Sequence, residues 1–241
     1  MDMHISGSGR VVSGEYDKIR ISGSGSLQGF VRCGSFHASG SCRGEEIECR
    51  EEFQVSGSSS FDKSVRAGSF GVSGAASFGG DMIVKTKLKC SGAVKCEGSI
   101  KCGTLVVSGK ASVRGDVEAE TVEVSGRLNC GGLLNAEEIT IRYDVGMEIG
   151  SIGGSKIVIY QEGRKRKHIR LPLLSSFVGA GGTVRVGSSI EGDEIALEGV
   201  KAQRVSGRVV AIGKDCEIDL VQYSEQIEIA PEAKVGKTEK L

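Results

Sequence analysis

The side chains most often used in catalysis are scarce in this sequence. Its three histidines are His4, His37 and His168. His37 falls at an outward position of the repeat described below, His4 lies near the N-terminus, and His168 lies in a basic stretch. A nucleophile needs a base held beside it, as in Ser/His/Asp or Cys/His sets, and the spacing here suggests no such set. The sequence therefore predicts no catalytic residues and a protein that is not an enzyme.

The eight cysteines raise the question of a metal site. Structural zinc sites favour Cys-x₂₋₄-Cys pairs, which are absent, and Cys90, Cys96 and Cys102 are six residues apart. Cys33 and Cys49 fall on neighbouring repeats at a spacing that a disulfide could reach, but a reducing cytosol argues against one. We interpret these thiols as small apolar fillers of a core. The sequence predicts no metal and no cofactor.

The elements that must position these residues are set by a repeat of the dipeptide Ser-Gly. The dipeptide recurs at intervals of 16 to 18 residues, and its serines are Ser6, Ser22, Ser39, Ser56, Ser73, Ser91, Ser108 and Ser125. A fixed short period sets the architecture of a whole chain. Late in each repeat, two apolar residues stand two positions apart, as in Ile19 with Ile21 or Phe53 with Val55. Period-two alternation in short runs between glycines indicates short, half-buried strands.

The repeat predicts an all-β fold, a parallel β-helix (β-solenoid) of coils of ~17 residues. Three short strands per coil would bend at Gly or Ser, with glycine taking corners of positive φ. Successive coils would pair at about 4.8 Å, which would stack Phe36, Phe53 and Phe70 inside. Since no single coil can bury its own core, the stack is the folding unit. Hexapeptide acyltransferases and pectin-degrading enzymes also use β-helices, but the period and composition fit neither.

Three regions are predicted along the chain: a solenoid of about nine coils over residues 1–160, a connector over 161–182, and a second, smaller β region over 183–241. In the last region, Glu194–Gly213 aligns with Glu217–Gly236 at an offset of 23 residues. This offset predicts wider coils. They would either extend the rod or pack beside it.

The connector combines a basic run, QEGRKRKHIR, with a short apolar run, LPLLSSFV. One interpretation is an exposed connector whose apolar residues pack back on the rod, since charge runs are usually solvated. The other is a contact with an anionic membrane surface or an acidic envelope partner. The residues of this second hypothesis are Arg164, Lys165, Arg166, Lys167, Arg170, Leu173, Leu174 and Phe177.

The overall charge favours no particular partner. Lysine and arginine number 31, as do aspartate and glutamate, so there is no global attraction to nucleic acid. The N-terminal residues show no secretory signal, and no apolar stretch approaches the ~20 residues of a membrane span. We expect a cytoplasmic protein, with the inner face of the cell membrane as a second location.

The Ser-Gly coils, as in VSGKASVRGDVEAETVEVSG, resemble those of the bactofilin family, the bacterial polymer-forming cytoskeletal proteins. The stretch SIEGDEIALEGVKAQRVSGRVVAIGKDCEIDLVQY is similar to the C-terminal part of longer bactofilin-like proteins of Gram-positive type. The resemblance implies a right-handed triangular β-helix that polymerises end to end without nucleotide. It also implies a scaffold in cell shape, envelope synthesis or motility. The basic insertion and the second β region depart from the shorter relatives.

The residues also favour self-assembly independently of the resemblance. A solenoid ends in open strand edges, which proteins normally cap or cover. With few residues before the first coil, we expect Val11, Val12, Ile19 and Ile21 to form an N-terminal assembly surface. The predicted function is a filament-forming scaffold whose partner is itself. The alternative is a non-polymerising adaptor that binds an envelope or flagellar partner, or the membrane surface, through the basic loop.

Overall fold

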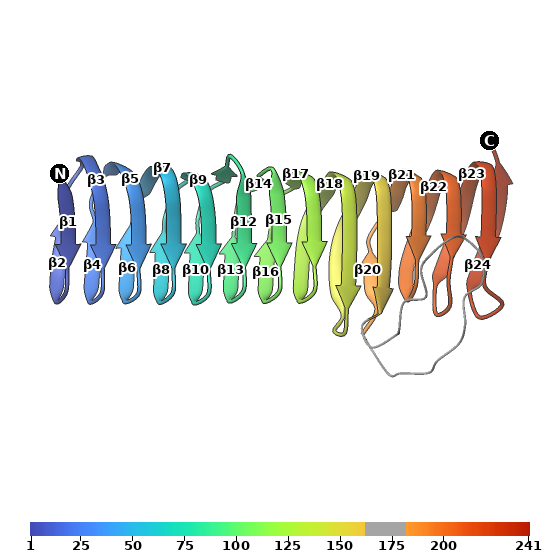
Figure 1. Cartoon of the computed structure of the whole chain (residues 1–241). Helices are drawn as coiled ribbons and strands as arrows, with labels where there is room; N and C mark the ends of the chain where they lie inside the picture. The colour runs from blue at the N-terminus through green and yellow to red at the C-terminus, as the bar shows by residue number, and fades with distance from the viewer. Residues whose placement is uncertain (162–181) are drawn as a thin grey trace.

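The computed structural model describes residues 1–161 and 182–241, and in that part of the chain every regular element is a β-strand. All pair into one sheet of 24 strands (Figure 1). In chain order these are β1 (Asp2–Ile5), β2 (Ser8–Val11), β3 (Gly14–Ile21), β4 (Ser24–Leu27), β5 (Phe30–Ala38), β6 (Ser41–Gly44), β7 (Glu46–Val55), β8 (Ser58–Phe61), β9 (Val65–Val72), β10 (Ala75–Phe78), β11 (Met82–Val84), β12 (Lys87–Cys90), β13 (Ala93–Cys96), β14 (Ile100–Lys101), β15 (Thr104–Val107), β16 (Lys110–Val113), β17 (Val117–Val124), β18 (Arg127–Tyr143), β19 (Met147–Gln161), β20 (Val184–Val186), β21 (Ser189–Leu197), β22 (Val200–Ile212), β23 (Glu217–Ile229) and β24 (Lys234–Lys240).

The sheet winds into a rod with three faces. Face A runs from β1 through the second half of β3 and β12 to the end of β23. Face B runs from β2 through β10 and β16 to the start of β24. Face C runs from the start of β3 through β11 and β14 to the end of β24. Every pairing is parallel, which confirms the predicted parallel β-helix, here of about 13 turns.

The region after the undescribed segment extends the same rod (Figure 1). Met147 of β19 is in register with Val184 of β20, and Ile157 is in register with Ile195 of β21. Of the two arrangements left open by the sequence, the structure has the extended one. The exact division at residues 160 and 182 stays a prediction.

The predicted wider coils are wrong in this region. Ile195 is in register with Val210, which is in register with Ile227, so the intervals are 15 and 17 residues. The 23-residue alignment instead matched Ile195 on face A with Ile218 on face B. Strands on two faces of a solenoid carry the same apolar alternation, and this likeness produced the false period.

The core is a set of columns that run along the rod. The last inward position of face A forms one unbroken column: Ile5, Ile21, Ala38, Val55, Val72, Cys90, Val107, Val124, Ile141, Ile159, Leu197, Ile212 and Ile229. Two residues earlier, Phe53 stacks between Phe36 and Phe70, with both ring-centroid distances 4.5 Å. The predicted aromatic stack is therefore confirmed.

The Ser-Gly corners need glycine for a reason other than the predicted one. The repeated glycines do not have positive φ; among described glycines, only Gly14, Gly29 and Gly199 do. At the corner the Cα–Cβ direction instead points along the rod axis. A Cβ on Gly74 would lie 2.0 Å from the carbonyl oxygen of Gly57 in the preceding coil. Close approach between coils excludes a side chain there.

The corner between faces B and C is held by side chains that cap the next coil. Ser64 Oγ accepts the Asp81 N–H at 3.2 Å, and Asp81 Oδ1 accepts the Ser99 N–H at 2.8 Å. The pattern continues: Ser99 Oγ accepts the Asp116 N–H at 3.1 Å, and Asp116 Oδ1 accepts the Leu133 N–H at 2.8 Å. This Ser/Asp ladder satisfies backbone donors where the strands are interrupted.

Candidate self-assembly ends

The N-terminal end of the rod presents three strand edges. Among the described residues, β1 pairs only with β3, β2 only with β4, and the Gly14–Tyr16 part of β3 only with β5. The carbonyls of Ile5 and Val11 accept hydrogen bonds from the second coil. Because backbone direction alternates along a strand, His4 and Arg10 turn their N–H and C=O groups outward. This end therefore offers an unpaired row of donors and acceptors.

The structure places the four predicted assembly residues differently from one another. Val12 is exposed (57%), as a contact residue should be, whereas Val11, Ile19 and Ile21 are buried. β1 lies in register over Ile19 and Ile21 and covers them. Three of the four side chains therefore belong to the core, and only Val12 is available at the surface.

A tyrosine closes the core at this end. Tyr16 is buried, and its hydroxyl donates to the Val12 carbonyl oxygen at 3.0 Å. In the following coils its register positions hold the small residues Cys33, Cys49 and Ala67. A large ring in a column of small side chains covers apolar surface that the end coil would otherwise expose. Sequence reasoning missed this residue, although its size among small repeat neighbours was a usable signal.

The C-terminal end repeats this arrangement on the same face C. Gly192 and Gly207 are in register and are followed by Tyr223, which packs against the core. Beyond it, β24 pairs only with β23 among the described residues, so its outer edge is also unpaired. Ile229 ends the face A column and is 41% exposed. Both ends of the rod thus combine a tyrosine over the core with an open backbone edge.

In the described chain, the cysteines lie in the core and His37 lies at the surface. All eight cysteines are free and buried, and burial raises the pKa of Cys42 and Cys102 to about 12. Cys33 and Cys49 are in register, as expected, and their hydrogen bond together with burial raises the pKa of Cys33. His37 Nε2 lies 3.6 Å from Glu52 Oε2 at the surface. In residues 1–161 and 182–241 there is no cluster of three metal-ligating side chains.

The predicted basic contact lies outside the described residues. This applies to Arg164, Lys165, Arg166, Lys167, Arg170, Leu173, Leu174, Phe177 and also His168. The membrane or envelope contact therefore stays a prediction. Within the described part of the chain, no helix has the length and apolar character needed to span a bilayer.

The three-faced solenoid with open strand edges and buried thiols places the described chain in the class of parallel β-helix proteins, which stack their repeats into a rod. Residues 71–168 match the model of the bactofilin family, described as polymer-forming cytoskeletal. Over these residues the chain matches the bactofilin domain, which confirms the resemblance predicted from the Ser-Gly coils.

A curated relative adds sequence support over a shorter stretch. The uncharacterized protein YhbE of Bacillus subtilis (strain 168) is 46% identical over 52 residues. The match covers 22% of this chain and 22% of that protein. No solved structure matches the chain.

Proposed function

We propose that this protein is a cytoskeletal scaffold that self-assembles end to end into filaments without nucleotide. The family description supports a polymer-forming role, and the open edges of the rod support the mode of assembly. Such filaments would serve cell shape, envelope synthesis or motility. The protein itself is the partner, and the role is non-enzymatic.

The observation that carries the proposal is the outward backbone of β1 and β2. Each strand edge can add a strand from another copy, as in β-augmentation. Tyr16 and Tyr223 already cover the core, so the bonding surface offered is mainly backbone rather than apolar. The side chains beside the edge would decide which strand can pair with it, and the exposed Val12 is the first candidate.

The cytoplasm is the compartment we propose for this assembly. Eight buried thiols without a disulfide fit a reducing environment. Two of them, Cys33 and Cys49, are in register on adjacent coils and remain free.

The test is to block the edge without disturbing the rod. Proline at Arg10 removes an outward N–H but no bond between β2 and β4, because the bonded carbonyls belong to the alternate residues. Arg10→Pro should abolish filaments seen by negative-stain microscopy and light scattering, whereas Arg10→Ala, which keeps the N–H, should form them. Val12→Lys should also weaken assembly.

The outcome depends on the other end of the rod. If the C-terminal ends also associate, Arg10→Pro should leave closed two-fold dimers rather than filaments. Circular dichroism must match the wild type in each variant. Unchanged filaments in folded Arg10→Pro would show that the N-terminal edge is not the interface, and isolated rods in the wild type at high concentration would refute polymerisation.

A further inference from the structure

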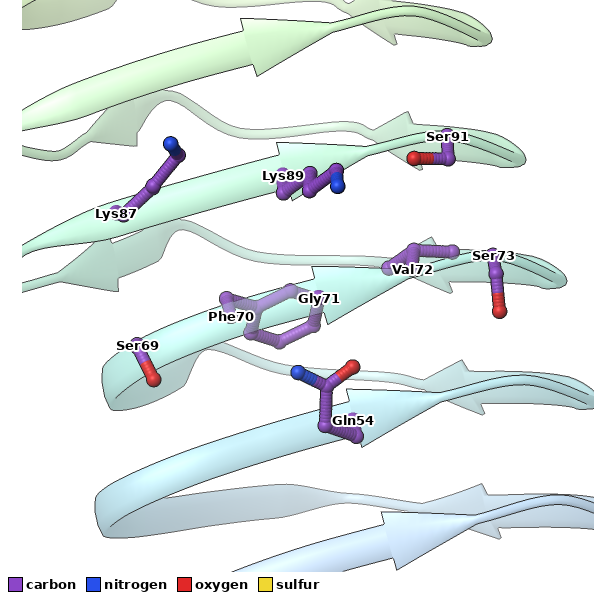
Figure 2. A pocket seen from close by; sticks show the side chains of 9 residues that line it. All are labelled: Gln54, Ser69, Phe70, Gly71, Val72, Ser73, Lys87, Lys89 and Ser91. Atoms are coloured by element: carbon purple, nitrogen blue, oxygen red, sulfur yellow. The ribbon is translucent and has the colours of Figure 1, made fainter.

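Face A carries a shallow depression between outward side chains of two strands that are separated by one strand. It has a volume of about 340 Å³ and is bordered by Gln54 of β7 on one side and by Lys87 and Lys89 of β12 on the other (Figure 2). The strand between them presents only Ser69 and Gly71. The hollow exists because this middle strand has almost no outward side chains.

The register fixes the walls of the depression. Gln54 is in register with Gly71, which is in register with Lys89. The Gln54 side chain leans over the glycine, since a Cβ on Gly71 would lie 2.3 Å from Gln54 Oε1. Gln54 Nε2 donates to Glu52 Oε1 at 2.8 Å. One wall is thus an oriented amide, and the floor is bare backbone with a serine hydroxyl.

The two lysines differ from the cations that pair with a carboxylate of the adjacent coil. Lys101 pairs with Glu118 at 2.7 Å, and Arg208 pairs with Glu225 at 2.7 Å. Lys87 and Lys89 are exposed and form no ion pair with any residue of the described chain.

Their surroundings keep them unpaired. On the next coil, Thr104 and Val106 occupy the register positions of Lys87 and Lys89. The nearest carboxylates in register on face A are each two coils away, or about 9.6 Å: Glu123 from Lys89 in one direction and Glu52 from Lys87 in the other. On both adjacent coils, the face A positions in register with the two lysines carry no carboxylate, so their charges are not neutralised by a direct neighbour.

We propose that this depression binds an extended acidic peptide with carboxylates two residues apart. Lys87 and Lys89 are themselves two residues apart on a strand, which spaces their outward directions by about 6.6 Å. A peptide in extended conformation presents alternate side chains at the same interval. The spacing therefore selects a Glu-x-Glu or Asp-x-Asp segment, with the serine hydroxyl and the Gln54 amide available to its backbone.

The class of ligand follows from the positive charges of the two lysines and from the lack of an exposed aromatic ring in the lining. The ring of Phe70, which contributes to the lining, is 2% exposed and faces the core, so no aromatic surface is offered to a sugar or a base. The site is independent of the rod ends, since it lies on a lateral face (Figure 1). In a filament it would recur once per subunit and could dock a partner along the polymer.

The experiment measures binding of a labelled ten-residue peptide containing Glu-Ser-Glu by fluorescence anisotropy at low salt, beside a matched peptide with both glutamates replaced by glutamine. Lys87→Ser with Lys89→Ser should weaken binding of the acidic peptide by about tenfold or more. The control, Lys110→Ser with Lys156→Ser, removes the same charge from exposed sites elsewhere on the rod and should change it little.

A second variant tests the hollow rather than the charge. Gly71→Leu would fill the floor, and the three atoms nearest to the new Cβ belong to the flexible end of Gln54. It should reduce binding without lowering thermal stability. Equal affinity for both peptides, no binding of the acidic peptide, or equal losses in the two double variants would overturn the proposal. So would binding of wild type to anionic lipid vesicles through these lysines with no binding of the peptide.

Discussion

Replacing Phe53 by alanine probes the column that holds the N-terminal half of the rod together. The ring is fully buried, stacks on Phe36 and on Phe70 with centroids 4.5 Å apart, and meets the edge of Phe61 at 5.5 Å. Truncating a buried phenylalanine costs about 3–5 kcal/mol. Each aromatic pair adds about 0.5–1.5 kcal/mol beyond burial. With three such pairs lost, we expect a loss near the top of that range, about 5 kcal/mol.

The measurement is urea unfolding followed by far-UV circular dichroism. Phe53→Leu keeps most of the apolar volume and should cost about 1–2 kcal/mol. Arg66→Ala, at an exposed position of the next coil, should stay within about 0.5 kcal/mol of wild type. If Phe53→Ala unfolded at the same urea concentration as Arg66→Ala, the column would not carry the packing described here.

Three further variants or conditions test the corners and the thiols. Gly74→Ala would bring a Cβ within 2.0 Å of a carbonyl oxygen in the preceding coil, so the urea midpoint of this variant should fall clearly. Gly7→Ala has no atom within 4 Å of the new Cβ and should unfold at the wild-type midpoint. Equal shifts in the two variants would contradict the close-approach argument. Asp116→Ala should lower the free energy of unfolding by about 1 kcal/mol, because it leaves the Leu133 N–H of the next coil without its acceptor. An unchanged urea midpoint would show that this hydrogen bond does not stabilise the rod. Stability should fall as pH rises above about 9, because the unfolded chain then releases thiol protons that Cys42 and Cys102, with pKa about 12, retain. Cys42→Ala should flatten that fall, which midpoints between pH 8 and 11 would reveal.

Much of the fold could be predicted because the repeat translates position in sequence into position in space. Residues one period apart lie in register, so the stacking of Phe36, Phe53 and Phe70 followed from spacing alone. The same logic failed after residue 182, where Ile195 and Ile218 look equivalent but lie on different faces. Alternation identifies a strand but not the face to which it belongs.

The ends of the rod were harder to predict. Burial of Ile19 and Ile21 depends on β1, in which Met3 and Ile5 form the same apolar pair before a Ser-Gly dipeptide; sequence reasoning missed this signal. The roles of Tyr16 and Tyr223 follow from the small size of their register neighbours, a signal that becomes visible only when a whole column of the repeat is compared. Likewise, both positive φ and close approach select glycine, so composition could not show that Gly74 serves the second purpose.

The uninterrupted face A column also means that the length of the rod is set by its number of coils. Its thirteen members, from Ile5 to Ile229, mark steps of about 4.8 Å, or about 58 Å in all. Removing residues 91–107 would join Cys90 to Ser108 at the same point of a coil and would shorten the rod by one step. Length can therefore be gained or lost in whole units during evolution while both ends stay intact, so the subunit repeat of a polymer can change without any change in its contacts.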